Sequence, residues 1–517
     1  MSVAGGSPLV RNTRKAIRTS IVCASATLFL VRLCIAATQP VALPQITGPI
    51  PGTPFNGNSI AHRPLDLATL GYDEQEYLVS GRANVYDWSP DGHFATKVLR
   101  TGDYTTRILV HKPTNPKRWN GAVVVEIVNM TGYGPKAGFD YPGVWANNWR
   151  EITRQGMAYV GITSKPNVFE ALRRYDPKRY AALNMANPLP ADRQTCGTLP
   201  SDANYNPNLS KSFENGLIYD AFAQLGALLH SDSPGNPLGG PAQRVYLTGL
   251  SQSAGYLKTY LRFIAPRAIL PHGGPVYDGY RAEGAVALLD GGQVPINQCA
   301  MPLPVSDPQL AIPDRGVPMI ELHSGADFVL DLPRQPDTAW YRLWEVPGTF
   351  HDDTWTFEYG YPNAKVFAQI LPQFAHDAIP RCASGFPPDP PYEDVYDSSL
   401  RLLDEWVRFG AQVPHVPHIQ DVNGKPLVDR NGNSTGGLRL PAVDVPVATY
   451  HTESFEPAVD CSHKTRFSDA ELRRLYPTHG NYVAMVGEVL IRLVEQRLLT
   501  PEDALSELIE ASRANVP

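Results

Sequence analysis

The segment Arg244-Val245-Tyr246-Leu247-Thr248-Gly249-Leu250-Ser251-Gln252-Ser253-Ala254-Gly255 decides the fold class. Its first five residues are rich in β-branched and aromatic side chains, which is typical of a buried strand. An amphipathic helix follows, because apolar residues recur at helical spacing: Leu257, Tyr260, Leu261 and Ile264. A serine on the tight turn between such a strand and such a helix is held with its hydroxyl exposed at the end of the sheet. The segment therefore predicts Ser251 as a nucleophile.

The turn around Ser251 can close only if the residues two positions before and after it are small, and these are Gly249 and Ser253. Ser253 is a rival nucleophile with small neighbours of its own, but it lies two residues further from the strand. Ser434 also has a rival pattern, since Gly432-Asn433-Ser434-Thr435-Gly436 shows the literal glycine spacing of such a turn. No buried strand precedes that Asn- and Gly-rich segment, so we exclude Ser434.

Buried strands alternate with helices along most of the chain. Eight runs rich in apolar, β-branched or aromatic residues predict strands at 76–80, 107–110, 121–128, 157–162, 244–248, 284–289, 318–322 and 341–346. A helix predicted at 149–155 makes a strand–helix–strand unit, which requires a parallel sheet and a right-handed crossover. The predicted fold class is therefore α/β, with a mostly parallel sheet of about eight strands and helices on both faces.

Two regions depart from this alternation. Residues 165–240 contain two helical patches around an irregular Asn- and Pro-rich length, which predicts a cap-like insertion near the site entrance. The C-terminal residues 395–517 contain two Asn-Gly turns and three predicted helices, at 400–409, 481–496 and 501–513. We expect this helical extension to pack on the core, so that 45–517 form one domain.

A carboxylate that orients a catalytic base is expected after a later strand, since α/β sheets place their sites beyond the carboxyl ends of the strands. Asp327 meets this condition because it follows the strand predicted at 318–322. Asp290 is its rival, since it follows the strand predicted at 284–289. A turn aspartate that caps its own backbone is the alternative role for Asp327.

The base is expected after the last strand, where His351 lies in a loop. The chain order Ser251, Asp327, His351 is the one found with this kind of strand–serine–helix turn. In such a set the imidazole takes the serine proton, and the aspartate holds the tautomer and stabilises the imidazolium. His351-Asp352-Asp353 contains no second His at ligand spacing, so we predict no metal.

Two N–H groups should bind the oxyanion that forms when Ser251 attacks a carbonyl. One belongs to Gln252, at the positive end of the following helix. The second is expected from the loop after the strand at 121–128, where Met130 and Thr131 are the candidates.

The first 37 residues have the pattern of a signal peptide. Basic residues precede an apolar run from Thr19 to Val31, and Cys34-Ile35-Ala36 offers a small-x-small cleavage site. Arg32 ends the run before the roughly 20 apolar residues of a membrane-spanning helix. We therefore expect a cleaved signal and a secreted or periplasmic protein, with an uncleaved membrane anchor as the alternative. In an oxidising compartment the other four cysteines predict up to two disulfides: Cys196, Cys299, Cys382 and Cys461.

Charge and composition limit the partners. The first 37 residues carry five basic and no acidic side chains, so their removal changes the net charge from −6 to −11. A chain that acidic, without a basic stripe, is not expected to bind nucleic acid. We expect a small-molecule ester substrate and no cofactor.

With these residues, the chain resembles the α/β hydrolase domain-containing proteins of the tenth α/β-hydrolase group, which are serine esterase-like. Matching segments cover nearly everything from about residue 45 to the end, and they lie within 123–129, 156–161, 176–180, 251–254, 342–351, 436–441 and 475–482. The resemblance implies an α/β-hydrolase fold and supports Ser251 and His351. The family often has a Glu two residues before the aspartate, where this chain has Gly325.

The expected activity is hydrolysis of a carboxylic ester or lactone through an acyl-enzyme on Ser251. Acyl transfer to an alcohol by the same triad is the first alternative. A non-catalytic binding protein is the second, because fold does not imply function. The complete set of Ser251, Asp327 and His351 argues against it. A cofactor-free oxidative role for the same triad is a third.

Overall fold

The computed structural model describes most of the chain from residue 40 onward. The described ranges are 40–88, 96–132, 138–188, 213–284, 296–297, 310–328, 334–351, 353–372, 390–452 and 464–517. Residues Gln39–Pro517 form one compact unit. The predicted signal segment, all six cysteines, Asp290 and the centre of the predicted insertion lie outside the described residues. Export and disulfide formation therefore stay predictions.

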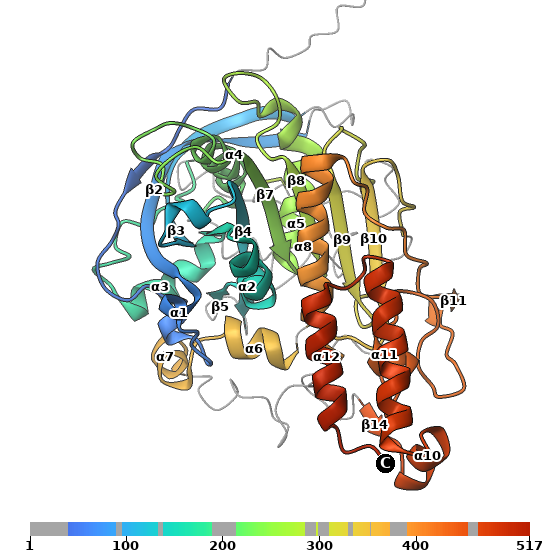
Figure 1. Ribbon diagram of the computed structural model, residues 1–517. Coiled ribbons are helices and arrows are strands. Elements are labelled where there is room, and N and C mark those ends of the chain that lie inside the picture. Colours follow the sequence, from blue (N-terminus) through green and yellow to red (C-terminus); the bar gives the residue numbers. More distant parts are fainter. Residues whose placement is uncertain are drawn as a thin grey trace, which may run out of the picture. The chain divides into compact units, whose positions relative to one another are not determined.

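The core of the described chain is a ten-stranded sheet, and nine strands follow the order β1-β2-β3-β6-β4-β7-β8-β9-β10 (Figure 1). From β6 to β10 along this order neighbouring strands are parallel. β1, β2, β3 and β5 pair antiparallel with their neighbours. The strands of the sheet are β1 Gln45–Thr47, β2 Tyr72–Trp88, β3 Thr96–Pro113, β4 Ala122–Gly132, β5 Gly138–Tyr141, β6 Ala158–Thr163, β7 Arg244–Leu250, β8 Gly279–Glu283, β9 Met319–Ser324 and β10 Tyr341–Val346. The mostly parallel α/β sheet is confirmed.

The expected eight strands omit β1 and β5. β1 has three residues and β5 has four. Segments that short show no clear period of two, so only their pairing with β2 and β4 reveals them.

Helices cover both faces of the sheet. α2 and α8 pack against each other on one face, whereas α5 follows β7 across the other (Figure 1). The helices are α1 Leu67–Leu70, α2 Gly143–Gln155, α3 Phe169–Tyr175, α4 Ile218–Leu229, α5 Gln252–Thr259, α6 Thr354–Gly360, α7 Ala364–Ile370, α8 Tyr392–Phe409, α9 Pro441–Asp444, α10 Asp469–Leu475, α11 His479–Glu495 and α12 Pro501–Arg513. None of those in the described part of the chain has the length and hydropathy that a bilayer-spanning helix needs.

α2 begins six residues before the predicted helix at 149–155. The buried carboxylate of Glu126, in β4, accepts the N–H groups of Val144 and Trp145 at 3.0 Å each. This carboxylate acts as a cap that comes from a distant strand, so local sequence does not reveal where α2 starts.

The strand between β7 and β9 begins five residues before the predicted one. β8 is Gly279–Glu283, whereas the prediction placed the strand at 284–289. β8 contains two charged residues, Arg281 and Glu283, so its sequence does not show the apolar pattern of a buried strand. Both are fully buried, and they form an ion pair of 2.5 Å. Asp290 therefore does not directly follow the end of this strand.

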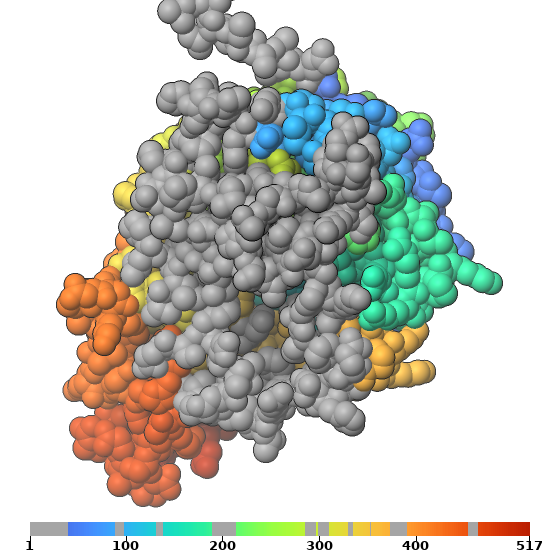
Figure 2. Space-filling view, turned by 180° about the vertical axis from the view of Figure 1, so that it is seen from behind, coloured from blue at the N-terminus to red at the C-terminus, as the bar shows by residue number. Residues whose placement is uncertain are grey.

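The predicted insertion contributes to the core. α4 lies within 165–240, and eleven of its twelve residues are buried. α3, from the same region, lies beside α7: Arg174 donates to the carbonyl of Ile370 at 2.9 Å, and Gln369 donates to that of Tyr175 at 3.0 Å. Figure 2 shows the two segments as neighbours at one edge, in green and orange.

The C-terminal extension contains the expected turns and helices, although α8 begins at Tyr392, eight residues before the predicted start at 400. Asn423 and Gly424 have φ of +54° and +77° and join β11 Asp421–Val422 to β12 Lys425–Pro426, as a two-residue Asn-Gly hairpin requires. α12 begins where predicted, and the hydroxyl of Thr500 accepts the N–H of Asp503 at 3.1 Å. A further small sheet pairs β13 Ala448–Tyr450 with β14 Lys464–Arg466.

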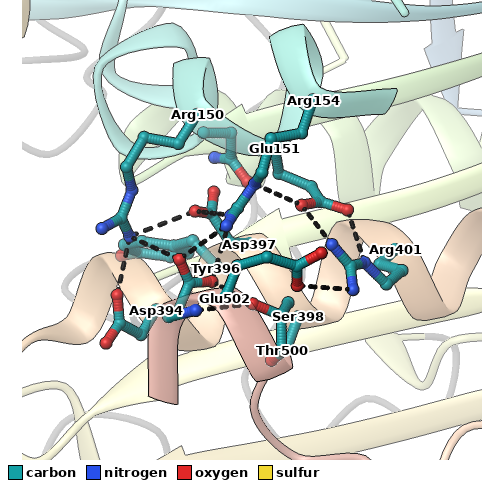
Figure 3. Close-up of polar contacts among 12 residues, drawn as sticks. Arg150, Glu151, Arg154, Asp394, Tyr396, Asp397, Ser398, Arg401, Thr500 and Glu502 are labelled. Atoms are coloured by element: carbon teal, nitrogen blue, oxygen red, sulfur yellow. Dashed lines mark hydrogen bonds and ion pairs between the residues drawn. The ribbon is translucent and has the colours of Figure 1, made fainter. Parts of the chain in front are cut away.

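A cluster of ion pairs joins α12 to α2 and α8 (Figure 3). Arg154 of α2 contacts Asp397 of α8 at 2.8 Å and Asp503 of α12 at 2.9 Å. Arg401 likewise bridges Glu151 and Glu502. Asp397 and Asp503 expose 3% or less of their side chains, so they depend on Arg154 and the neighbouring Arg150 for compensation of their charge.

Replacement of Arg154 by Met should lower the free energy of unfolding by about 2–3 kcal/mol, because it removes a cation from buried Asp397 and Asp503. Urea unfolding measures this difference. Arg513→Met breaks an exposed pair with Glu510 and is the control, with no expected change in the urea midpoint. Equal shifts for the two variants would contradict the proposed importance of the cluster.

Candidate active site

Ser251 lies on a sharp turn between the end of β7 and the start of α5. Its φ of +58° and ψ of −126° fall in a region that non-glycine residues rarely adopt and that costs of order 1–3 kcal/mol. The turn is so tight that a Cβ at Gly249 would lie 2.7 Å from the carbonyl carbon of Ser253. A glycine is therefore needed two residues before Ser251, as this kind of turn demands.

The two rival serines lie in different surroundings. Ser253 is fully buried, and its hydroxyl lies 2.7 Å from the Nζ of Lys165 and 3.2 Å from the carbonyl of Val128. Ser434 lies in the C-terminal extension, where it forms an isolated β-bridge with Val428. Of the three serines, Ser251 alone combines a strained turn with partial exposure.

His351 and Asp327 are directly hydrogen bonded. The imidazole Nδ1 and the carboxylate Oδ1 are 2.7 Å apart, and both side chains are buried. The second oxygen of Asp327 accepts the N–H of Ser324 at 2.9 Å. Burial by itself would raise the pKa of Asp327, but the imidazole and this N–H lower it below the ordinary value. An ionised Asp327 favours a proton on Nδ1 and leaves Nε2 as the basic nitrogen.

Gly325, where the resembled family often has a Glu, has no room for a side chain. A Cβ at this position would lie 2.9 Å from the amide nitrogen of Gly348 and 3.3 Å from Thr452. The backbone around Asp327 is therefore built for glycine two residues before it. The carboxylate that meets His351 is that of Asp327.

The end of β8 connects Ser251 with the His351–Asp327 pair. The N–H of Ser251 donates to the carbonyl of Glu283 at 2.7 Å. The next residue, Gly284, has φ +56°, and a Cβ there would lie 2.8 Å from the His351 ring and 3.2 Å from Asp327. Ser251, Asp327 and His351, which follow β7, β9 and β10, thus lie around the end of β8. All three belong to the carboxyl edge of the parallel sheet, where α/β folds place their sites.

A family comparison bears on the fold. The model of a family described as alpha/beta hydrolase domain matches residues 46–508. The chain belongs to this family. The resemblance inferred from the sequence segments is thereby confirmed, and so is the α/β-hydrolase fold.

Solved structures similar to this hydrolase are distant. Esterase Est22 is 13% identical over 62% of this chain and 81% of its own, with a TM-score of 0.26. XC6422 from Xanthomonas campestris, an a/b serine hydrolase without lid, is 11% identical over 60% of this chain and 97% of its own, with a TM-score of 0.24. Acetyl xylan esterase 1 from Thermoanaerobacterium sp. JW/SL YS485 is 12% identical, with a TM-score of 0.23. The match covers 47% of this chain and 53% of that esterase. No curated protein matches the sequence significantly.

The predicted oxyanion donors lie on two elements of the hydrolase. Gln252 is the first residue of α5, where an N–H has no acceptor within the helix. Met130 and Thr131 do not form the expected loop, because β4 continues to Gly132 and pairs these residues with β5. A hydrophobic run up to residue 128 did not reveal that the strand continues through polar residues. The role of all three as oxyanion donors stays a prediction.

Three buried charged residues near the site were not among the sequence candidates: Glu126, Lys165 and Glu283. Burial raises the pKa of Glu126 to about 8 and that of Glu283 to about 7, although hydrogen bonds to the first and Arg281 beside the second oppose the shift. The sequence contains a sign that Glu126 is unusual, since it is the one charged residue inside the apolar run at 121–128. Glu283 lies just outside the strand predicted at 284–289, so the sequence does not indicate that it is buried at a strand end.

Gly284→Ala should break the hydrogen bond between His351 and Asp327, because the new Cβ would press on the imidazole. Proton NMR should then lose the downfield resonance of the bonded Nδ1–H. Gly273→Ala is the matched control: its φ is +86°, but nothing lies within 4 Å of the added Cβ. It should cost a similar backbone strain of about 1–2 kcal/mol and keep the resonance. Loss of the resonance in both variants would contradict the steric explanation.

Proposed function

We propose that this chain is a serine hydrolase that cleaves a carboxylic ester or lactone through an acyl-enzyme on Ser251. The observation that carries the proposal is the 2.7 Å hydrogen bond between His351 and Asp327, beside the strand end that binds the backbone of Ser251. The strained turn of Ser251 supports it further, since such strain persists where the surrounding structure and the function require it.

In the proposed reaction the Oγ of Ser251 attacks the carbonyl carbon, and Nε2 of His351 accepts the hydroxyl proton. The tetrahedral intermediate then expels the alcohol, which takes the proton from His351, and an acyl-enzyme remains. Water repeats the sequence, releases the carboxylic acid and restores Ser251. Asp327, ionised by its surroundings, holds the imidazole in place and stabilises its protonated form.

The negative oxygen of the tetrahedral intermediate would lie at the N-terminus of α5. The N–H of Gln252 is the first donor, and a second comes from the β4 end at Met130 or Thr131. Donors of this kind act most strongly where the position of the oxyanion is fixed before reaction. The strained Ser251 turn fixes the first of them.

We also propose that the hydrolase acts outside the cytoplasm. The basic and apolar pattern of residues 1–37 supports export. The four remaining cysteines could then pair as disulfides.

A fluorophosphonate probe should label this hydrolase once, on Ser251, because that hydroxyl alone is set on the strained turn beside His351. Ser251→Ala should abolish labelling and reduce turnover of p-nitrophenyl esters to the residual that binding and oxyanion stabilisation still provide. Ser434→Ala is the control and should keep both. Peptide mapping that placed the label on Ser253 would shift the nucleophile by two residues. A folded protein without any labelling would favour a non-catalytic role.

Asp327→Asn should retain the fold and lower kcat for p-nitrophenyl esters by up to about 10⁴, since an amide favours the wrong imidazole tautomer. Asp337→Asn provides a matched control, because Asp337 accepts from His415 at 2.6 Å in a similar pair away from the site. Its kcat should equal that of the wild type. A nearly silent Asp327→Asn combined with a crippling Asp290→Asn would exchange the two assignments.

A further inference from the structure

Lys165 is a buried lysine two residues after the end of β6. It exposes 2% of its surface. Its Nζ lies 2.7 Å from the hydroxyl of Ser253, 3.1 Å from that of Ser164 and 3.2 Å from the carbonyl of Val128. An ammonium group has three N–H donors and no acceptor. The three neighbours therefore match the charged form of the side chain.

Two of the three acceptors of Lys165, Ser253 and Val128, belong to the two segments that carry the proposed oxyanion donors. Ser253 lies in the first turn of α5, one residue after Gln252. Val128 lies in β4, directly before Asn129 and two residues before Met130. The hydroxyl of Ser253 also contacts the carbonyl of Val128 at 3.2 Å and the side chain of Asn129 at 3.3 Å. One ammonium group thus links the start of α5 to the end of β4.

The charged groups around Lys165 come from several elements. Burial lowers the pKa of Lys165 to about 7, although the carboxylates of Asp140 in β5 and Glu126 in β4 oppose this shift. Arg107 of β3 pairs with Asp140 at 3.4 Å, so it takes up part of that charge. From α5, the ring of Tyr256 lies 5.0 Å from the Nζ, a cation–π distance.

We propose that Lys165 is a positioning residue for the oxyanion hole of this hydrolase. Its ammonium group holds the first turn of α5 against the end of β4, so that the N–H of Gln252 and the N–H from β4 converge on one point. Its charge, behind these donors and away from water, also favours the negative oxygen over the neutral carbonyl. The proposal rests on the proposed function, since it assumes an oxyanion on the substrate bonded to Ser251.

The side chain of Ser253 connects α5 both to Lys165 and to β4. Its hydroxyl is fully buried between Lys165 and β4, so a substrate carbonyl has no access to it. The residue two positions after the nucleophile must be small for the turn to close. A serine at that position meets this requirement and also supplies an acceptor for the ammonium group, which alanine does not.

The test compares Lys165→Met, Ser253→Ala and the double variant. Hydrolysis of p-nitrophenyl acetate gives kcat and KM. The inhibition constant of a trifluoromethyl ketone, which binds as an oxyanion on serine, is compared with that of the unfluorinated ketone of the same length. Lys165→Met should lower kcat by about 10- to 100-fold with KM within about twofold, less than the loss of a direct donor. It should weaken the trifluoromethyl ketone by a similar factor and leave the unfluorinated ketone unchanged.

Coupling between the two residues is the second readout. Ser253→Ala should show the same selective loss, about tenfold, and the double variant should be no worse than Lys165→Met, because the two side chains act as a unit. The pH profile is the third. Lysine is charged below its pKa, so kcat/KM of the wild type should fall as pH rises through the titration of Lys165. Lys165→Met should lack this decline.

Lys258→Met is the matched control, since it removes another buried lysine, which lies in α5 with Ser253 and pairs with Glu321 at 2.6 Å. It should lower thermal stability without changing the ratio of the two inhibition constants. If Lys165→Met does not fold, Ser253→Ala carries the test. Variants that keep kcat and both inhibition constants within about twofold, or that weaken both ketones equally, overturn the proposal. A wild type that neither hydrolyses esters nor reacts with a fluorophosphonate overturns the proposed function instead.

Discussion

The backbone of Ser251 keeps its strained conformation because neighbouring strands hold it from two sides. On one side its N–H donates to the end of β8 at 2.7 Å. On the other side, Ser253 donates through its hydroxyl to the carbonyl of Val128 in β4. Strain of this size persists only where the surroundings over-determine the geometry. The turn therefore depends on the strand order β4-β7-β8, which places a neighbouring strand on each side of β7.

Several charged side chains are buried in and around the central sheet. They form ion pairs with one another: Arg107 with Asp140 at 3.4 Å, Arg281 with Glu283 at 2.5 Å, and Lys258 with Glu321 at 2.6 Å. Apolar side chains of similar volume would often be as stable or more stable at such positions. The Arg281–Glu283 pair lies at the strand end that binds the N–H of Ser251, so it is consistent with a trade of stability for function beside a reactive site.

The sequence predicts the parts of this protein that depend on local patterns. Runs rich in apolar, β-branched or aromatic residues identify β4, β6, β9 and β10, and a single turn pattern identifies Ser251. The errors arise where tertiary contacts override local composition. β8 carries Arg281 and Glu283, which look exposed and are buried because they pair, so the strand was placed too late. Likewise, residues 129–132 form a strand because β4 pairs with β5, and their composition does not predict it. The proposed role of Lys165 depends on its contact with Ser253, 88 residues away, which no local pattern predicts.

The C-terminal extension completes the support of the site. Gly348, in the loop before His351, has φ +80°, and a Cβ there would lie 2.7 Å from Val443 of the extension. The N–H of Leu438 donates to the carbonyl of Glu345, near the end of β10, at 2.8 Å. Arg334 links the carboxylate of Glu345 at 2.9 Å to the β11 hairpin. The loops that carry Asp327 and His351 therefore pack against residues that follow them by about a hundred positions. A truncation after α8 would remove these contacts from the loops of Asp327 and His351, and the family's matched region likewise continues past the sheet to residue 508.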